Sequence, residues 1–256
     1  MSKFLKNALI TGAGKRIGSE IADSLSSEGW NLVLHYNTSK NAAYKLAEKL
    51  NKTYGNKVIC LKANLEEYSQ FKKIFSKIDK KLGTLSCLIN NAAVFHYDSL
   101  KSTNLKKWNM NINTNIRAPL FLSQYFAKKL PSNKNGNIIN IIDQRVLNLT
   151  PHFLTYTLSK SALWTLTQTL ALALAPNIRV NAIGPGPTIK SKRQTNKKFA
   201  EQCEKMPLMR GADAKEIGNL VKIILNTPSM TGQIIALDGG QHLGWAQSQH
   251  NSFHED

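Results

Sequence analysis

The chain has 256 residues, 42% of them hydrophobic and 20% charged, which is enough apolar sequence for one large domain or two small ones. This composition excludes a disordered chain and a collagen-like repeat. Lys and Arg number 34 against 16 Asp and Glu, a net charge of +18 that would suit nucleic acid. The lysines are scattered over predicted helix faces, so we expect no nucleic-acid partner.

Apolar segments of strand length alternate with helix-length segments along the whole chain. Strands are expected at residues 7–10, 31–35, 57–62, 85–90, 137–142, 178–183 and 233–237. Helices are expected at residues 17–28, 39–54, 68–82, 105–130, 153–175 and 213–225. This order predicts an α/β fold, a single Rossmann-type doubly wound domain over residues 1–256 with about seven parallel strands and helices on both faces. The long irregular stretch 184–210 is expected to be a functional substrate loop, and 246–256 a polar tail.

The sequence predicts no membrane span, no export signal and no metal site. The richest apolar run, at 162–175, is interrupted by three Thr and one Gln. The N-terminal residues reach the first glycines after a short apolar run, unlike a secretory signal, so a cytoplasmic location is expected. Cys60, Cys87 and Cys203 lie far apart and the six His lack ligand spacing, so neither a disulfide nor a bound metal is predicted.

A glycine-rich turn follows the first strand and opens the first helix. It reads Thr11-Gly12-Ala13-Gly14-Lys15-Arg16-Ile17-Gly18. Glycines permit a tight turn and a close backbone approach, and the start of the helix offers free N–H groups to a pyrophosphate. The position of the turn, between a strand and a helix, predicts a dinucleotide-binding site.

The end of the second strand indicates which dinucleotide is bound. NAD-binding sheets usually carry an acid here for the ribose 2′-hydroxyl, but this strand ends Leu34-His35-Tyr36-Asn37-Thr38-Ser39. His35, Ser39, Lys15 and Arg16 supply donors and positive charge that suit a 2′-phosphate instead. NADPH is therefore predicted as the cofactor, and the alternative for His35 is a half-buried residue without contact to it.

Tyr156 and Lys160 lie four residues apart, on one face at the head of a long helix. A nearby ammonium favours the phenolate and would bring the pKa of Tyr156 toward neutrality, so that it can exchange protons. Two further motifs accompany this pair and the glycine turn. They are Asn90-Asn91-Ala92-Ala93, at the end of the fourth predicted strand, and Pro185-Gly186-Pro187-Thr188, after the sixth. With these motifs the chain resembles the short-chain dehydrogenase/reductase family from residue 5 to about residue 243.

The resemblance implies roles for individual residues. Tyr156 would be the acid/base, Lys160 would bind the nicotinamide ribose, and Asn115 would complete a proton relay; the alternative for Asn115 is a cap or kink in its helix. The residues expected to contact the cofactor are Gly12, Lys15, Arg16, Ile17, Gly18, His35, Tyr36, Ser39, Asn64, Leu65, Asn91, Ala92, Ala93, Tyr156, Lys160, Pro185, Gly186 and Thr188. The resemblance also implies a homotetramer, with contacts through the helices at 105–130 and 153–175 and the segment Asp238-Gly239-Gly240.

Three departures from the usual family pattern point to one branch. Asp143 stands 13 residues before Tyr156 where the family usually has Ser, Arg16 replaces the middle Gly, and Phe95 closes the run after the fourth strand. Together with the run Leu34 to Ser39, these residues are similar to the pteridine reductases, which include trypanosomatid enzymes and bacterial dihydromonapterin/dihydrofolate reductases. Two residues depart from this pattern: Asn64 replaces the Asp that commonly meets the adenine, and Thr38 stands where the trypanosomatid enzymes carry Arg.

The branch implies a chemistry that its residues can perform. Phe95 would stack a flat pterin against the nicotinamide, and Arg16 would bridge cofactor phosphate and pterin edge. Asp143 and Tyr156 would supply a proton to nitrogen as hydride reaches carbon. We predict NADPH-dependent reduction of a C=N bond in a dihydropterin or dihydrofolate, with Arg16, Phe95, Asp143 and Tyr156 as substrate-binding residues.

Alternatives stay open for these residues and for the activity. Asp143 could instead cap a strand end or pair with Arg145, and Phe95 could be core packing. A carbonyl reductase of the same family, acting on a ketone, a sugar or an acyl thioester, would turn over ketones and no dihydropterin. A non-catalytic NADPH-binding regulator would bind the cofactor without oxidising it. The sequence does not indicate which pterin or folate is physiological, or what Trp245 does.

Overall fold

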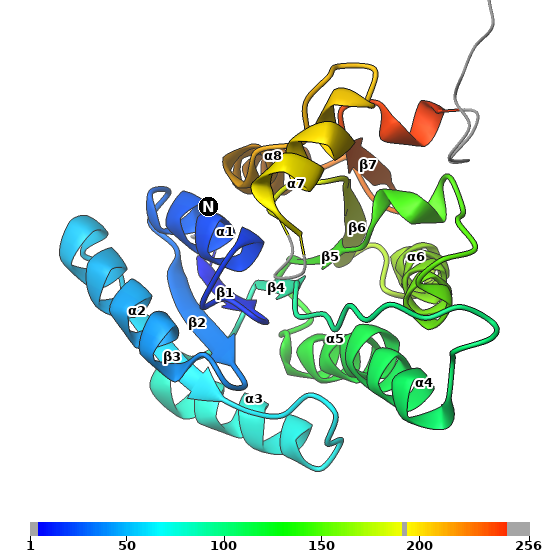
Figure 1. Cartoon of the computed structure of the whole chain (residues 1–256). Coiled ribbons are helices and arrows are strands. Elements are labelled where there is room, and N and C mark those ends of the chain that lie inside the picture. The colour runs from blue at the N-terminus through cyan, green and yellow to red at the C-terminus, as the bar shows by residue number, and fades with distance from the viewer. Residues whose placement is uncertain (1–4, 191–193, 245–256) are drawn as a thin grey trace, which may run out of the picture.

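The computed structural model describes residues 5–190 and 194–244 of the chain. Trp245, the predicted tail at 246–256 and part of the predicted loop at 184–210 lie outside the described residues. In the described part, seven strands form one sheet in the order β3-β2-β1-β4-β5-β6-β7, and every neighbouring pair is parallel (Figure 1). This strand order is that of a Rossmann-type doubly wound fold, so the predicted fold class is confirmed.

The strands lie close to their predicted positions. They are β1 (Asn7–Ile10), β2 (Asn31–Tyr36), β3 (Val58–Lys62), β4 (Cys87–Asn90), β5 (Gly136–Ile141), β6 (Ile178–Pro185) and β7 (Ile234–Leu237). The central strands β1, β4 and β5 are buried along their whole length, because helices cover both faces of the sheet. Successive side chains alternate between the faces, so Ala8 and Ile10 join one core while Leu9 joins the other.

Each face of the sheet has its own helical layer. On one face α1 (Ile17–Ser26), α2 (Lys40–Tyr54) and α8 (Ala214–Asn226) contribute buried aliphatic side chains, and α1 packs against α8 (Figure 1). On the other face lie α3 (Gln70–Lys81), α5 (Ala118–Lys129) and α6 (Leu154–Ala173). Two further helices, α4 (Leu105–Ile112) and α7 (Asn196–Glu204), lie before α5 and after β6.

The long helix predicted at 105–130 is interrupted by a π-helical turn, η1 (Asn113–Arg117), between α4 and α5. The N–H of Ala118 donates to the carbonyl of Asn113, five residues earlier, instead of to the fourth. Pro119 follows at the start of α5 and has no N–H to donate to Asn115. The prediction of one continuous helix was therefore wrong at this turn, which carries Asn115.

The prediction of an irregular stretch at 184–210 was wrong for residues 196–204, which form α7; the helix has few apolar side chains and none of its residues is buried. Thr195 caps this helix by accepting a hydrogen bond from the N–H of Lys198. Two short 3₁₀ turns complete the described elements, η2 (Gln144–Val146) after β5 and η3 (Gln241–Leu243) after β7. Over the described residues, no helix combines the length and apolar character that crossing a membrane requires.

Candidate active site

The predicted site residues lie at the carboxyl edge of the sheet. The glycine turn follows β1, Ser39 follows β2, and Asn64 and Leu65 follow β3. The run from Asn91 to Ala93 follows β4, while Pro185, Gly186 and Thr188 end and follow β6. Parallel strands bring their carboxyl ends to one edge, which is where open α/β sheets bind ligands.

The glycine turn has the backbone shape of an anion cradle. Gly12 has φ +64, and a Cβ built on Gly18 would lie 2.5 Å from the Gly12 carbonyl oxygen. Helix α1 begins after Arg16, whose side chain makes no capping hydrogen bond. The N–H groups of Ser19 and Glu20 donate to the Arg16 carbonyl, so the N–H groups of Ile17 and Gly18 are the ones open to a phosphate. These features fit a dinucleotide pyrophosphate.

Asn91 and Thr11 hold this turn against the end of β4. The Asn91 Nδ2 donates to the carbonyl oxygens of Thr11 at 2.8 Å and Gly12 at 3.2 Å. The Thr11 hydroxyl oxygen accepts from the N–H groups of Asn91 and Ala92, both at 2.9 Å. Asn91 thus acts on the shape of the turn, and its predicted contact with the cofactor stays a prediction.

His35 does not have the position predicted for a phosphate ligand. It is only 2% exposed; its Nδ1 accepts from the Gly12 N–H at 3.2 Å and its Nε2 lies 3.1 Å from the Ala63 carbonyl oxygen. Burial lowers the pKa of His35 to about 4, so the ring is neutral at physiological pH. Both nitrogens are occupied by protein groups and the charge is absent, so a role in binding the 2′-phosphate is corrected to a role in supporting the turn.

The other predicted residues around the cofactor ribose differ in how they can act. The side chains of Tyr36 and Leu65 are buried in the core, so only their backbone could face a cofactor. The Asn64 Nδ2 donates to Glu67 at 3.1 Å within its own turn. The Ser39 Oγ lies 2.9 Å from a Cβ built on Gly14, beside the glycine turn, and Lys15 is exposed there. Ser39 and Lys15 therefore remain candidates for a 2′-phosphate.

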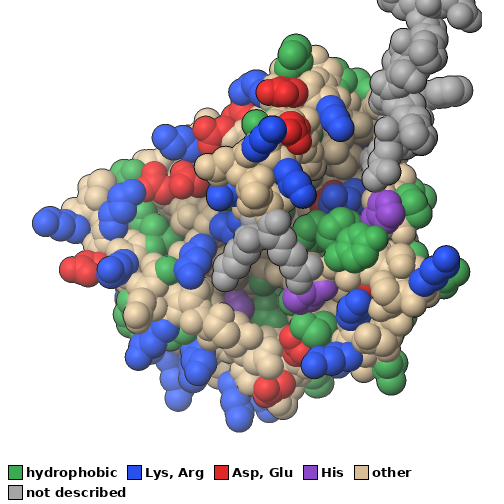
Figure 2. Space-filling model, in the orientation of Figure 1, with side chains coloured by type: hydrophobic (Ala, Val, Ile, Leu, Met, Phe, Trp, Pro, Cys, Tyr) green, Lys and Arg blue, Asp and Glu red, His purple; other side chains and the backbone are tan. Residues whose placement is uncertain are grey.

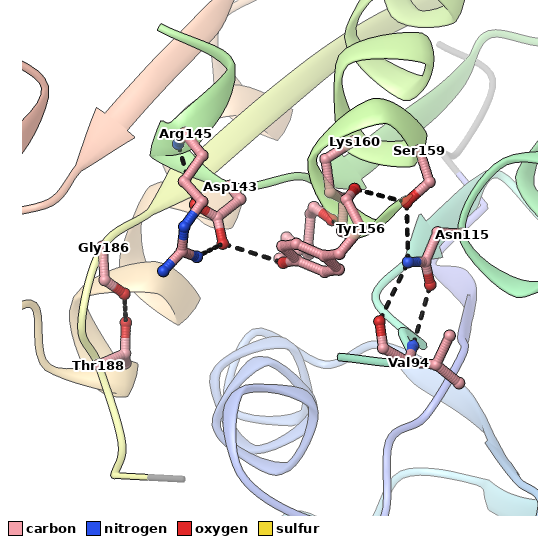
Figure 3. Close-up of polar contacts among 10 residues, drawn as sticks. Val94, Asn115, Asp143, Arg145, Tyr156, Ser159, Lys160, Gly186 and Thr188 are labelled. Carbon is pink, nitrogen blue, oxygen red and sulfur yellow. Dashed lines mark hydrogen bonds and ion pairs between the residues drawn. The ribbon is translucent and has the colours of Figure 1, made fainter. Parts of the chain in front are cut away.

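The Asp143 carboxylate lies between Tyr156 and Arg145 (Figure 3). Tyr156 is 6% exposed, and its hydroxyl donates to the Asp143 Oδ2 at 2.9 Å. The Arg145 Nη1 donates to the same oxygen at 3.0 Å, and the Arg145 N–H donates to Oδ1 at 2.9 Å. The predicted pairing of Asp143 with Tyr156 is present, and so are the alternatives of a cap and an Arg145 ion pair.

The pKa of Tyr156 shifts in the direction opposite to the prediction. Burial is the largest cause and raises this pKa well above 10, and the negative charge of Asp143 raises it further. The positive charge of Arg145 lowers it, but by less. The Lys160 Nζ donates to the Ile141 carbonyl at 2.8 Å and lies 5.7 Å from the centroid of the Tyr156 ring. Burial also lowers the pKa of Lys160 itself to about 8. Lys160 therefore does not bring Tyr156 toward neutrality in this arrangement, and Tyr156 carries its proton at neutral pH.

Asn115 is fully buried in the π-helical turn and joins three segments of the site. Its Oδ1 accepts from the Val94 N–H at 2.9 Å, and its Nδ2 donates to the Val94 carbonyl at 3.1 Å and to the Ser159 Oγ at 3.0 Å (Figure 3). The Ser159 hydroxyl donates in turn to the Tyr156 carbonyl at 2.7 Å. The helix irregularity considered for Asn115 is present, and its part in a proton relay stays a prediction.

Phe95 is 41% exposed, which rules out the alternative of plain core packing. Its ring stacks on Phe153, with centroids 4.4 Å apart and planes at 7°, and meets the Tyr156 ring edge-on at 4.7 Å. The predicted stacking residue therefore lies directly beside the candidate acid, with an exposed surface that a flat ring could cover.

Arg16 connects the start of α1 to the segment after β6. Its Nη1 and Nη2 donate to the carbonyl oxygens of Lys190 at 2.9 Å and Ile189 at 2.8 Å. Together with Thr188 and Arg210, Arg16 lines a cavity of about 700 Å³ at this side of the sheet edge. The predicted contacts of Arg16 with a phosphate and a pterin would require the guanidinium to share or leave these carbonyls.

Two site residues were missed by the sequence. Asp98 is completely buried, and its carboxylate accepts from the Thr155 N–H at 3.2 Å and hydroxyl at 2.6 Å, at the head of α6. Phe153 precedes α6 in the left-handed region with φ 58. A cap normally comes from the residue just before a helix, so a carboxylate 57 residues away left no local signal.

Comparison with known proteins places this geometry in a family. A family model described as short chain dehydrogenase matches residues 6–202. An uncharacterized oxidoreductase, YmfI, from Bacillus subtilis is 30% identical over 242 residues, covering 93% of this chain and 99% of the relative. The chain belongs to the short-chain dehydrogenase family. The predicted family resemblance and the prediction of an oxidoreductase are thereby confirmed.

Two further members of the family are similar over nearly their whole length. The crystal structure of FolM alternative dihydrofolate reductase 1 from Brucella suis, in complex with NADP, has a TM-score of 0.90 and 40% identity, covering 94% of this chain and 96% of that one. The 3-oxoacyl-[acyl-carrier-protein] reductase FabG from Staphylococcus epidermidis is 28% identical over 243 residues, covering 93% of this chain and 99% of the relative. The FolM structure supports the predicted resemblance to the pteridine and dihydrofolate reductase branch.

Proposed function

We propose that the protein is an NADPH-dependent reductase of a C=N bond in a dihydropterin or dihydrofolate. The observation that carries this proposal is the contact between Tyr156 and Asp143, in place of the Ser that suits a ketone oxygen, beside the exposed ring of Phe95. Similarity to the FolM alternative dihydrofolate reductase bound to NADP supports the branch and the cofactor.

The residues present fit the dinucleotide. The open N–H groups at the start of α1 and the Gly12 turn would hold the pyrophosphate, and Ser39 and Lys15 would hold the 2′-phosphate. The buried ammonium of Lys160, close to the Tyr156 ring, would bind the nicotinamide ribose. When bound, NADPH supplies a hydride.

The side chains of the site would complete the reduction on the substrate nitrogen. Hydride adds to the carbon of the C=N bond, whose π electrons move to nitrogen, and the hydroxyl of Tyr156 releases its proton to that nitrogen. A phenol with a raised pKa is a weak acid that keeps its proton until a strongly basic nitrogen forms. Phe95 would cover one face of the flat substrate and exclude water there.

A carbonyl reductase is the second candidate, because FabG is among the relatives and the Tyr156–Lys160 pair is intact. Asp143 argues against it, since an anion beside the acid disfavours charge developing on a ketone oxygen. A non-catalytic regulator would bind NADPH without oxidising it.

The homotetramer and the cytoplasmic location stay predictions. On the face shown in Figure 2, Lys and Arg side chains are spread out, with acidic side chains among some of them. The absence of a nucleic-acid partner stays a prediction.

The test is NADPH oxidation with dihydrobiopterin, dihydromonapterin and dihydrofolate, and with a panel of ketones. We expect turnover of a dihydropterin or dihydrofolate, and a loss of about a hundredfold or more in the Asp143→Ser variant with NADPH binding unchanged, because Asp143 orients the Tyr156 hydroxyl by accepting its hydrogen bond at 2.9 Å. Asp79→Ser is the matched control, because Asp79 pairs with Lys129 at 2.7 Å on the exposed surface. Turnover of ketones alone would overturn the proposal in favour of the second candidate.

A further inference from the structure

Arg145 contacts both the proton-transfer pair and the aromatic rings beside it. It lies in the 3₁₀ turn after β5, and its side chain is 18% exposed. Among the described residues, the Asp143 carboxylate accepts three hydrogen bonds, from the Tyr156 hydroxyl, the Arg145 guanidinium and the Arg145 N–H. A guanidinium is always charged and forms its strongest hydrogen bonds with an ionised carboxylate. The arrangement is therefore that of an ion pair, in which Asp143 acts as an ionised acceptor.

The guanidinium is also located by the aromatic wall of the site. Its central carbon lies 5.4 Å from the centroid of the Phe95 ring and 5.2 Å from that of Phe153, within the range of a cation–π contact. Figure 3 shows one terminal nitrogen of Arg145 at the carboxylate and the other pointing away from it. The same side chain thus contacts the proton-transfer pair and the rings that would face the substrate.

The charges of the site explain why a fixed cation is needed there. After Tyr156 releases its proton, a phenolate would lie 2.9 Å from the Asp143 carboxylate, and two anions at that separation repel each other strongly. Within the described part of the chain, the charged groups around Asp143 are Arg145, in direct contact, and Lys160 on α6, whose ammonium donates to the Ile141 carbonyl instead. Arg145 is thus the cation placed to offset the second negative charge.

We propose that Arg145 is a positioning residue of the proton-transfer site, which holds Asp143 as an ionised acceptor and offsets the charge that Tyr156 develops as it gives up its proton. Tyr156 is then the proton donor and Asp143 is not. This inference rests on the proposed function for its choice of substrate, but its physical content concerns the chain's own charges. Removal of Arg145 should slow proton transfer and leave cofactor binding intact.

The first experiment compares Arg145→Met with Arg145→Lys, which keeps the charge. Arg179→Met is the matched control, because the Arg179 guanidinium also donates to protein carbonyls, those of Met230, Ile224 and Leu225, away from the site. We expect Arg145→Met to lower kcat about ten- to a hundredfold with unchanged NADPH affinity, and Arg145→Lys to recover most of it. The solvent deuterium isotope effect on kcat should grow in Arg145→Met, and the effect of deuterium at the transferred hydride should shrink.

A purely structural role for Arg145 would lower activity without moving either isotope effect and would not be rescued by Lys, and that result overturns the proposal. A second measurement needs no substrate: carbon-13 NMR of labelled Asp carboxyls at neutral pH, with Asp143 assigned from the Asp143→Asn variant. We expect the ionised signal, and a protonated signal overturns the proposal. If the wild type reduces no pterin, the proposed function fails, while the NMR result still decides the state of Asp143.

Discussion

The neutral, buried His35 predicts a specific dependence of stability on pH. Its pKa is lowered from 6.5 to about 4 in the folded protein, so below about pH 6.5 the unfolded chain binds a proton that the folded chain does not. The contribution of His35 is therefore fully present above pH 6.5 and is lost as the pH falls toward 4. From about pH 7.5 to about pH 5, these two values correspond to a loss of about 2 kcal/mol of unfolding free energy.

The assay is urea unfolding of the wild type and of a His35→Gln variant at both pH values. Other titrating groups contribute equally to both proteins, so they cancel in the difference between the two unfolding free energies. We expect the unfolding free energy of the wild type, minus that of the variant, to be about 2 kcal/mol larger at pH 7.5 than at pH 5. A difference that stays constant with pH would refute a buried neutral histidine.

The same residue predicts an effect on the cofactor site. His35→Asn keeps an acceptor near the position of Nδ1, whereas His35→Gln keeps a donor near Nε2, which faces the Ala63 carbonyl. Loss of the hydrogen bond from the Gly12 N–H costs about 1 kcal/mol. We therefore expect NADPH to bind about fivefold more weakly to His35→Gln than to His35→Asn in a fluorescence titration. Tighter binding to the Gln variant would contradict the support that His35 gives the turn.

Substitutions at three other positions test the site. Gly18→Ala places a Cβ 2.5 Å from the Gly12 carbonyl oxygen, so we expect NADPH affinity to fall about tenfold or more by titration; unchanged affinity would contradict the tight turn. Phe95→Leu should raise the KM for a pterin about two- to tenfold with little change in Tm, because the ring is exposed and stacks. Equal effects on ketone substrates would argue against a stacking role. Asp98→Ala should lower the unfolding free energy by about 2–3 kcal/mol, because it leaves the buried Thr155 N–H without its cap, and Asp98→Asn should recover part of the loss in urea unfolding.

Most of the fold could be predicted because its signals are local. The strands are buried on both faces and therefore read as apolar runs, and a turn that brings Gly18 against Gly12 admits only residues without a Cβ. The pairing of Tyr156 with Lys160 follows from helix geometry alone. Helix α7 was missed because it buries no side chain, and the π turn because the effect of Pro119 depends on the hydrogen bonds of its neighbours.

The candidate site was predicted as a set of residues, but the state of several of them was not. The sequence by itself determined the alternation of strands and helices, the dinucleotide-binding turn, and the motif in which Asp143 stands 13 residues before Tyr156. Each of these depends only on residue type and spacing. Only the tertiary structure decided that His35 is neutral and that the pKa of Tyr156 is raised. It likewise decided that Arg145 lies against both Asp143 and Phe95. Ionisation depends on burial and on charges within a few ångströms, and folding brings those neighbours from segments far apart in the chain.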